Sequence, residues 1–201
     1  KIIMIDFWNK RYNEDGFAYG TNPNAFFKEQ IDKLKVGNLL LPLEGEGRNA
    51  VYAASKGWKV DAVDQSEIGH DKTRKFAKEN NVPLKYFLQN IEDFKAPSEY
   101  YDAIGLIYAH LPPITREDLH KSIVKTLKLK GIVMLEAFSK KQVNYPSGGP
   151  KTEEMLFSVD ELKRDFSRLK ILSINEKLIT LDEGKYHQGK AMVVRLVAQK
   201  R

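Results

Sequence analysis

Short apolar runs alternate with amphipathic stretches along most of this chain. The apolar runs predict strands at 38–43, 58–64, 84–89, 102–109 and 131–138. Helical spacing predicts helices at 47–56, 66–81 and 115–127. Because strands that alternate with helices pair in parallel through right-handed crossovers, this order indicates a parallel sheet with helices on its faces.

The pattern changes toward the carboxyl end of the sequence. Two long strand-like runs, 169–181 and 190–198, are joined by the short connection 182–189, which contains Gly184 and Gly189. So short a connection predicts a hairpin, and one of its two strands must therefore run antiparallel to the rest. The predicted fold class is α/β, a Rossmann-like, mostly parallel sheet closed by an antiparallel hairpin.

Composition narrows the setting without fixing the chemistry. The 201 residues fit one domain, and 42% apolar with 30% charged residues is an ordinary soluble balance. The absence of cysteine excludes disulfides and cysteine-ligated zinc, and no metal site is predicted. No apolar run nears the ~20 residues that span a bilayer, so we expect a cytoplasmic protein without a membrane segment.

The net charge of +6 comes from 33 Lys and Arg against 27 Asp and Glu. The basic residues are scattered among acidic ones, which favours a solvated surface over a nucleic-acid interface.

A glycine turn, Leu43–Asn49 (LEGEGRN), follows the first predicted strand and opens the first helix after it. Such a turn lets a ligand approach the backbone, next to the free N–H groups of the helix. Glu44 and Glu46 would repel a pyrophosphate and attract an ammonium or sulfonium group. The turn therefore favours S-adenosylmethionine over NAD; the alternative is a tight turn whose glutamates cap the helix.

Polar residues also follow the second and third predicted strands. Asp64 lies seventeen residues after Gly47, where an acid accepts hydrogen bonds from a ribose diol. Its alternative role is to cap the helix that starts near Ser66. Asn90 is placed to bond an adenine edge and Ile91 to pack on its face, unless the two form an ordinary turn.

Two histidines are candidates for proton transfer. His110 and Tyr108 end the fourth predicted strand, just before a double proline, and His187 lies at the tip of the hairpin. Either imidazole titrates near neutrality and could act as a base. The alternatives are a structural histidine in a proline turn and an exposed turn histidine. Tyr108 and Tyr145 are the candidate residues of the acceptor pocket; for Tyr145, in the loop 142–150, the alternative is an ordinary surface loop.

Several segments together resemble the class I S-adenosylmethionine-dependent methyltransferases, over nearly the whole chain. GEGRNAVYAASKGWKVDAVDQS, Gly45–Ser66, resembles the tellurite-resistance branch, and LLLPLEGEG, Leu39–Gly47, the thiopurine branch. FWNKRY and FAYGTNPNAFF resemble the amino-terminal cover over the cofactor in these enzymes. YDAIGLIYAHLPP and LKLKGIVMLEAF resemble their fourth and fifth strand motifs.

The resemblance implies a seven-stranded sheet in a single domain, 1–201, with 1–36 as a helical cover and 37–201 as the Rossmann-like core. It also implies that the glycine turn holds the amino-acid part of the cofactor, Asp64 the ribose, and Asn90 with Ile91 the adenine. The sequence departs from the family where its usual acid and first glycine fall at Leu41 and Leu43, so Glu44 or Glu46 becomes the candidate partner of the cofactor ammonium. The candidate cofactor-binding residues are Trp8, Tyr12, Glu44, Gly45, Glu46, Gly47, Asn49, Asp64, Gln65, Gln89, Asn90, Ile91 and Ile107.

The predicted function is methyl transfer from S-adenosylmethionine to a small-molecule acceptor, with a soft sulfur, selenium or tellurium nucleophile as one acceptor class. Such a nucleophile needs no strong base, whereas a base can assist transfer to oxygen or nitrogen acceptors. After the fourth strand the chain has His110-Leu111-Pro112-Pro113, which does not match the motif of nucleic-acid amino-methyltransferases. The alternatives are an NAD-dependent oxidoreductase and a non-catalytic module that binds the cofactor.

Overall fold

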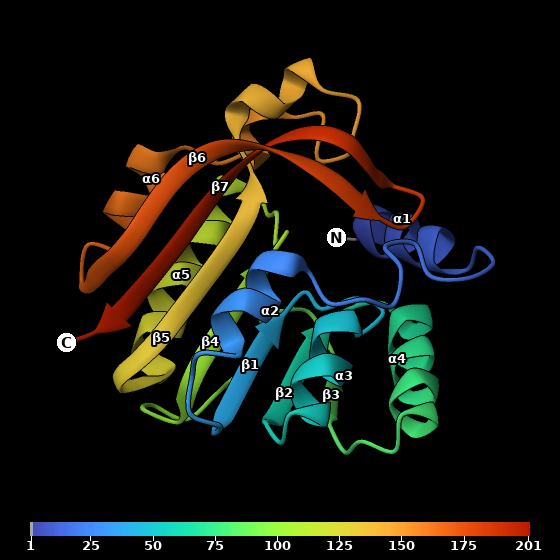
Figure 1. The fold of residues 1–201 in the computed structure, drawn as a ribbon, viewed down its shortest axis with the longest axis horizontal. Helices are drawn as coiled ribbons and strands as arrows, with labels where there is room; N and C mark the ends of the chain where they lie inside the picture. Colours follow the sequence, from blue (N-terminus) through green and yellow to red (C-terminus); the bar gives the residue numbers. More distant parts are fainter. Residues whose placement is uncertain (1) are drawn as a thin grey trace.

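The computed structural model describes residues 2–201, whose strands form one seven-stranded sheet in the order β3-β2-β1-β4-β5-β7-β6. The strands are β1 (Asn38–Pro42), β2 (Lys59–Asp64), β3 (Lys85–Leu88), β4 (Tyr101–Ile107), β5 (Leu127–Phe138), β6 (Leu169–Glu183) and β7 (His187–Lys200). The helices are α1 (Ile2–Tyr12), α2 (Ala25–Ile31), α3 (Arg48–Ser55), α4 (Glu67–Glu79), α5 (Pro113–Thr126) and α6 (Val159–Asp165), with 3₁₀ turns at Lys140–Asn144 and Glu153–Met155. Figure 1 shows the parallel strands pointing toward the hairpin of β6 and β7.

Strand pairing confirms the predicted fold class. β1 pairs in parallel with β2 on one side and β4 on the other, so the direction of sheet growth switches between β1 and β4. β7 pairs antiparallel with both β5 and β6. In open sheets of this kind, ligands bind beyond the carboxyl ends of the strands at such a switch point.

Two strand boundaries differ from the sequence prediction. The hairpin is tighter than expected, because Glu183 pairs with His187 and only 184–186 remain in the turn. β5 begins at Leu127 rather than at Gly131, and the pairing with β4 shifts register before Ile132. Lys130 lies there with a φ of 62°, a left-handed residue between the alternating Leu127-Lys128-Leu129 and the apolar run that begins at Gly131.

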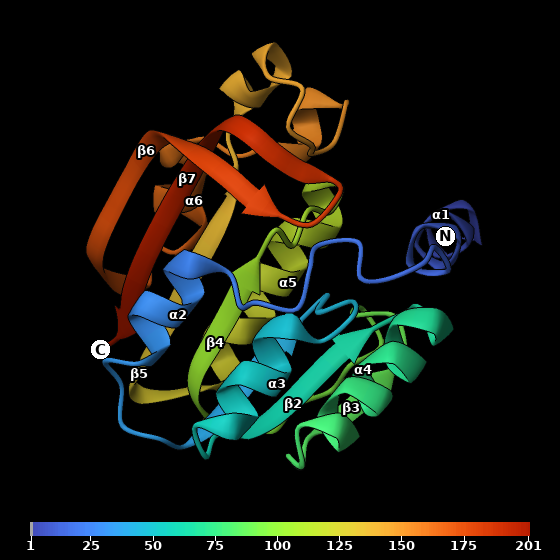
Figure 2. The same cartoon turned by 45° about the vertical axis from the view of Figure 1, so that its right-hand side comes forward.

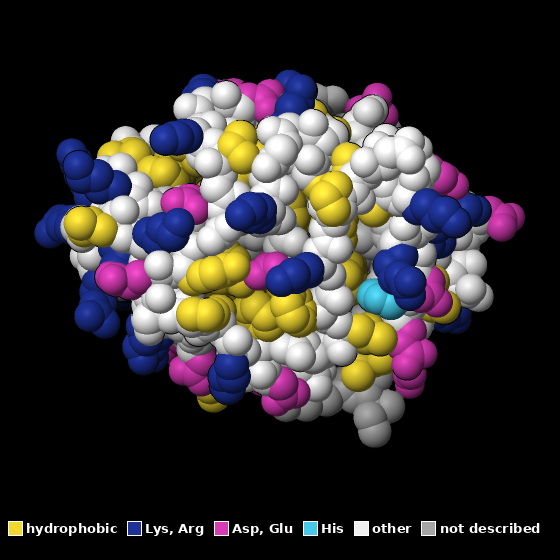
Figure 3. Space-filling view, turned by 90° about the horizontal axis from the view of Figure 1, so that it is seen from below, with side chains coloured by type: hydrophobic (Ala, Val, Ile, Leu, Met, Phe, Trp, Pro, Cys, Tyr) yellow, Lys and Arg dark blue, Asp and Glu magenta, His cyan; other side chains and the backbone are white. Residues whose placement is uncertain are grey.

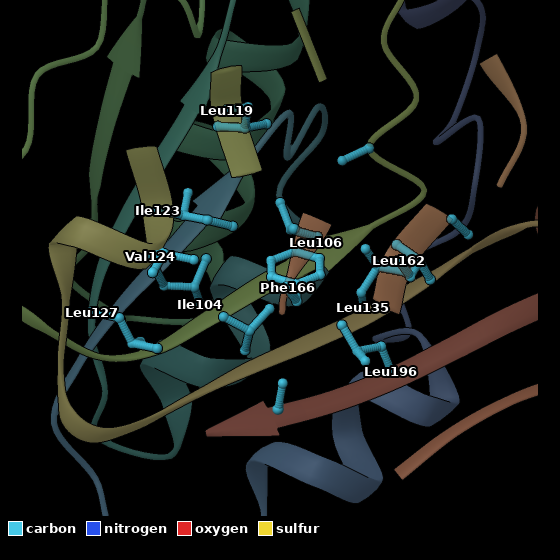
Figure 4. Packing of buried hydrophobic residues seen from close by; sticks show 14 of the residues in the cluster. Ile104, Leu106, Leu119, Ile123, Val124, Leu127, Leu135, Leu162, Phe166 and Leu196 are labelled. Carbon is cyan, nitrogen blue, oxygen red and sulfur yellow. The ribbon is translucent and has the colours of Figure 1, made fainter. Parts of the chain in front are cut away.

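Helices cover both faces of the sheet and enclose two main apolar cores. α2 and α3 pack on one face through Phe26, Phe27 and the alanines of α3. On the other face, α5 and α6 pack against β4 and β5, and Figure 4 shows Ile123, Leu162 and Phe166 from this layer meeting strand residues. Because each large apolar side chain buried contributes ~1.5–3 kcal/mol, these two layers hold the strand ends in fixed positions.

The segment 1–36 divides into two parts in the structure. α2 is part of the core, since Phe27 and Ile31 are fully buried against the sheet. α1 instead lies beside α4, at the edge of the molecule, with the chain 13–20 running from it toward the hairpin (Figure 2). We use the word cover for α1 together with residues 13–20.

The surface shows no concentration of basic residues on the face drawn in Figure 3, which views the molecule from below relative to Figure 1. Lys and Arg side chains are scattered there among Asp and Glu. Within residues 2–201, no helix is long and apolar enough to cross a membrane.

Candidate active site

Every second residue of the glycine turn has a left-handed backbone. Leu43, Gly45 and Gly47 have φ values of 54°, 63° and 83°. Leu43 occupies the position where the resembled family has glycine, and it keeps the left-handed conformation at a cost of ~1–2 kcal/mol. The turn thus has a left-handed residue at each of these three positions.

Gly45 and Gly47 are required by close packing of protein atoms. A Cβ on Gly45 would lie 2.4 Å from Tyr12 Oη, and one on Gly47 would lie 2.4 Å from Thr73 Cγ2. The Gly45 carbonyl also accepts hydrogen bonds from Tyr86 Oη at 2.7 Å and Thr73 Oγ1 at 3.1 Å. The turn is thus clamped between the cover, α4 and β3.

The two glutamates of the turn have different partners. Glu44 Oε1 accepts from the Ala50 N–H at 2.7 Å, so this side chain caps α3, which is the alternative role considered from the sequence. Glu46 accepts from the Ala18 N–H at 2.8 Å and from Lys72 Nζ at 2.9 Å, and so binds the cover. Burial raises the pKa of Glu44 to about 7 and also raises that of Glu46, for which Lys72 compensates in part.

Asp64 joins the glycine turn to the start of α4. One carboxylate oxygen accepts from the Gly45 N–H at 3.0 Å and the other from the Ser66 N–H at 2.9 Å. Ser66, not Asp64, caps α4, because its hydroxyl accepts from the Gly69 N–H. Burial raises the pKa of Asp64 to about 6. Each carboxylate oxygen keeps a further lone pair for a ligand.

The remaining candidates for the cofactor lie around this turn. Trp8 stacks on Tyr12, which is buried over Gly45, with ring centroids 5.4 Å apart. Asn49 accepts from the Asn24 N–H at 2.9 Å and so ties α3 to the start of α2. The others end or follow neighbouring strands: Gln65 after β2, Gln89, Asn90 and Ile91 after β3, and Ile107 as the last residue of β4.

His187 lies in an aromatic box at the carboxyl end of β4. Its ring centroid is 4.4 Å from that of Tyr19, 4.6 Å from Tyr108 and 5.2 Å from Phe138. The side chain is only 5% exposed, so the hairpin histidine is not an exposed turn residue. The loop 147–150 closes the box, because a Cβ on Gly148 would lie 2.9 Å from the His187 ring.

The two ring nitrogens of His187 are in different environments. Nδ1 lies 3.2 Å from Glu183 Oε2, and Nε2 has no hydrogen-bond partner among the described residues. Within those residues, Arg116 Nε is the one fully buried side-chain nitrogen or oxygen that lacks a hydrogen-bond partner. His187 Nε2 also lacks a partner, so it is not fully buried and is reachable from solvent. Burial lowers the pKa of His187, although the Glu183 carboxylate opposes this.

A buried polar network lies behind the aromatic box. Glu136 accepts from Asn24 Nδ2 at 2.7 Å, from Tyr108 Oη at 2.9 Å and from Arg195 Nε at 2.6 Å. Asn24 Nδ2 also donates to Glu183, 3.0 Å away. None of these polar partners was predicted from the sequence; the one signal of the network there is Glu136, a lone acid inside the apolar run GIVMLEAF.

His110 is held on both sides by backbone. Its Nδ1 lies 2.8 Å from the Met155 carbonyl oxygen, and its Nε2 accepts from the Phe138 N–H at 3.2 Å. Burial lowers its pKa to about 4. With neither nitrogen free, the geometry favours the structural alternative for His110. Tyr145 is half-buried and makes none of the ring contacts around His187 within the described residues.

The cover is fastened to the hairpin tip. Arg11 donates to Tyr19 Oη at 3.0 Å and lies 4.1 Å from the centroid of the Tyr186 ring. Glu14 accepts from both Lys185 and Tyr186. The amino-terminal cover and the tip of the carboxyl-terminal hairpin are therefore held together beside the glycine turn.

Comparison with known proteins relates this chain to methyltransferases. A sequence family described as a methyltransferase domain matches residues 44–131, from the glycine turn into β5. The chain is 25% identical over 192 residues to the ubiquinone biosynthesis O-methyltransferase of Rickettsia akari (strain Hartford), covering 90% of this chain and 74% of that protein. The chain is therefore an S-adenosylmethionine-dependent methyltransferase.

Solved structures agree with the methyltransferase fold. TehB from Haemophilus influenzae has a TM-score of 0.73 at 19% identity, covering 98% of this chain and 67% of that one. A SAM-dependent methyltransferase from Methanosarcina mazei has a TM-score of 0.69 at 17% identity, covering 86% and 96%. At these identities the likeness establishes the fold alone.

The charges of the methyltransferase's glycine turn fit its cofactor. Glu44, Glu46 and Asp64 bring three carboxyl groups to the turn, and Lys72 forms an ion pair with Glu46 only. Such an excess of carboxylates favours a ligand with ammonium and sulfonium groups and disfavours a pyrophosphate. These carboxyl groups therefore suit S-adenosylmethionine better than NAD.

Proposed function

We propose that this methyltransferase transfers the methyl group to a hydroxyl of a small, flat, uncharged molecule bound against His187. The observation that carries the proposal is the free Nε2 of a buried histidine whose other nitrogen faces a carboxylate. A hydroxyl needs a base during transfer, whereas a soft nucleophile does not. The name of the Rickettsia relative, an O-methyltransferase, supports an oxygen acceptor.

The walls of the box support a flat apolar acceptor. Tyr19, Tyr108 and Phe138 offer ring faces and edges on three sides of His187. Two charged pairs lie nearby, Arg48 with Glu183 and Arg195 with Glu136, and this pairing favours an uncharged acceptor. An aromatic or other planar hydroxyl compound matches this environment.

On the cofactor side, the proposed binding residues are those expected from the sequence. Asp64 would accept from the ribose hydroxyls, Glu44 or Glu46 would face the ammonium, and Asn90 with Ile91 would contact the adenine. Trp8 and Tyr12 would cover the cofactor from α1. When bound, S-adenosylmethionine supplies a methyl group on an excellent leaving group, so the protein contributes mainly position.

The proposed role of His187 is to remove the acceptor proton. The hydroxyl proton passes to Nε2 as the new oxygen–carbon bond forms and the carbon–sulfur bond breaks. The ionised Glu183 carboxylate stabilises the resulting imidazolium, and the proton then passes to water. Because burial lowers the pKa of His187, the imidazole is neutral and able to accept a proton at pH 7.

The test is a panel of acceptors that share a ring and differ in the nucleophile: phenols and catechols, thiophenols, and anilines. Formation of S-adenosylhomocysteine is measured for the wild type, His187→Gln and, as a control on the same hairpin, Gln188→Ala. We expect turnover with a hydroxyl acceptor that falls ~10²–10⁴-fold in His187→Gln alone.

The outcomes separate the alternatives left by the sequence. Turnover restricted to thiols and unaffected by His187→Gln would replace the proposal with the soft-nucleophile class suggested by the tellurite-type and thiopurine-type resemblance. Binding of S-adenosylhomocysteine without turnover of any acceptor in the panel would count against the proposed acceptor class.

A further inference from the structure

One carboxylate oxygen of Glu183 is shared between the cofactor side and the acceptor side. Arg48 NH2 donates to Glu183 Oε2 at 2.9 Å, and His187 Nδ1 lies 3.2 Å from the same oxygen. Arg48 is the first residue of α3 and directly follows Gly47, the last glycine of the turn. A single pair of contacts therefore links the glycine turn to the histidine.

Glu183 is held firmly enough to orient a ring. Its other oxygen accepts from Asn24 Nδ2 at 3.0 Å, and Arg48 NH1 also donates to the Tyr19 carbonyl at 3.2 Å. Burial alone would raise the pKa of Glu183, but the hydrogen bond from His187 and the charge of Arg48 outweigh it and lower the pKa to about 2. Glu183 is therefore an acceptor only at any pH at which the protein is used.

An acceptor-only partner at Nδ1 fixes the tautomer of a neutral imidazole, since the nitrogen facing it must carry the proton. The nitrogen left without a proton is then Nε2, which is the one reachable from solvent. If Glu183 lost its ion pair, the carboxylate could rotate away and both tautomers would become accessible.

We propose that Arg48 is a positioning residue which, through Glu183, holds His187 as the Nδ1–H tautomer with Nε2 free. The tautomer itself can be tested without knowledge of the acceptor; only its catalytic use rests on the proposed function. The polar and titratable groups that surround His187 are Glu183 on β6, Tyr19 and Arg11 on the cover, Arg48 on α3, and Tyr108 and His110 after β4.

The experiment is ¹⁵N NMR of the whole chain labelled at histidine, which has four imidazoles to resolve. The His187 signals are assigned by their loss in His187→Gln, and the long-range couplings report which nitrogen carries the proton. We expect the Nδ1–H form to dominate in the wild type. A pH titration of the same NMR signals gives the His187 pKa.

Two variants should move that pKa in opposite directions. Arg48→Met removes a positive charge and should raise the His187 pKa, whereas Glu183→Gln removes the opposing carboxylate and should lower it and admit the Nε2–H form. Arg195→Met is the matched control, because it breaks the neighbouring Arg195–Glu136 pair, which does not touch His187. Loss of packing alone would not produce opposite shifts.

Arg48→Lys keeps the charge and provides a second variant if Arg48→Met fails to fold. It should leave the His187 pKa near the wild-type value while weakening the tautomer preference. A wild-type His187 that is mainly Nε2–H, or a tautomer and pKa unchanged in both Arg48→Met and Glu183→Gln, would overturn the proposal. A correct tautomer combined with full turnover in His187→Gln would refute the proposed function and leave this inference standing.

Discussion

Asn24 combines two tasks that an aspartate could not perform together. Its Oδ1 accepts from the Phe27 N–H at 2.9 Å and caps α2. Its Nδ2 donates to Glu136 at 2.7 Å and to Glu183 at 3.0 Å. At an ordinary helix start, asparagine and aspartate are about equally good caps. Here we expect Asn24→Asp to be worse than Asn24→Ala.

The magnitudes follow from these contacts. Asn24→Ala loses a cap of ~1 kcal/mol and two hydrogen bonds to charged groups of ~1.5–3 kcal/mol each. Because these losses share one side chain and a water can replace part of it, we expect a net cost of about 3–5 kcal/mol. Asn24→Asp keeps the cap but places a third carboxylate against two others, and a buried charge without a partner adds ~3–5 kcal/mol.

The assay is urea unfolding followed by tryptophan fluorescence between pH 5.5 and 8. The neighbouring carboxylates raise the pKa of the introduced carboxyl, so its stabilising form is the protonated one. That stability is present at low pH and is lost as the pH rises. Asn24→Asp should therefore fall below Asn24→Ala at pH 8 and recover toward pH 5.5. An Asn24→Asp protein that equals or exceeds Asn24→Ala at pH 8 would refute the reasoning.

Three further outcomes are expected. Gly47→Ala should lower the free energy of unfolding by ~2–5 kcal/mol, because of the left-handed backbone and overpacking. Gly16 has a φ of 76°, but a Cβ there would meet nothing within 4 Å. In the same unfolding assay, Gly16→Ala should therefore lose only the backbone part. His110→Phe should lower the melting temperature by stranding two buried backbone groups while leaving the pH profile of turnover unchanged. Affinity for S-adenosylmethionine, measured by calorimetry, should rise between pH 5 and 8. The reason is that a cationic ligand favours the ionised forms of Glu44 and Asp64, whose pKa values are about 7 and 6. The affinity for S-adenosylhomocysteine, which lacks the sulfonium, should depend less on pH.

The strands and helices around the glycine turn were predictable because each element buries one face, and this leaves a period in the sequence. The pattern thus located β1, α3, β2 and the hairpin to within a few residues. It placed the start of β5 too late, because Leu127 to Lys130 alternate apolar and lysine residues and lie outside the continuous apolar run from Gly131.

The buried network was not predictable for a different reason. Asn24 and Glu183 are 159 residues apart, and Arg48 and Glu183 are 135 apart, so no local pattern relates them. The burial of His187 likewise depends on Tyr19 and Phe138, which arrive from the cover and from β5. Spacing identified the glycine turn expected to hold the cofactor, but only the fold shows which polar groups share one oxygen.

The fastening of the cover to the hairpin tip has a consequence for biosynthesis. Glu14 leaves the ribosome 171 residues before Lys185, its partner in the folded protein. At ~5–20 residues per second, roughly 10–30 seconds separate the two. During that interval β1 to β5 can pair, yet Arg48, Asn24 and Glu136 lack their hairpin partners, and their polar groups must stay hydrated. A nascent chain can therefore complete its sheet from the glycine turn outward, but it becomes a complete enzyme only when its last hairpin arrives.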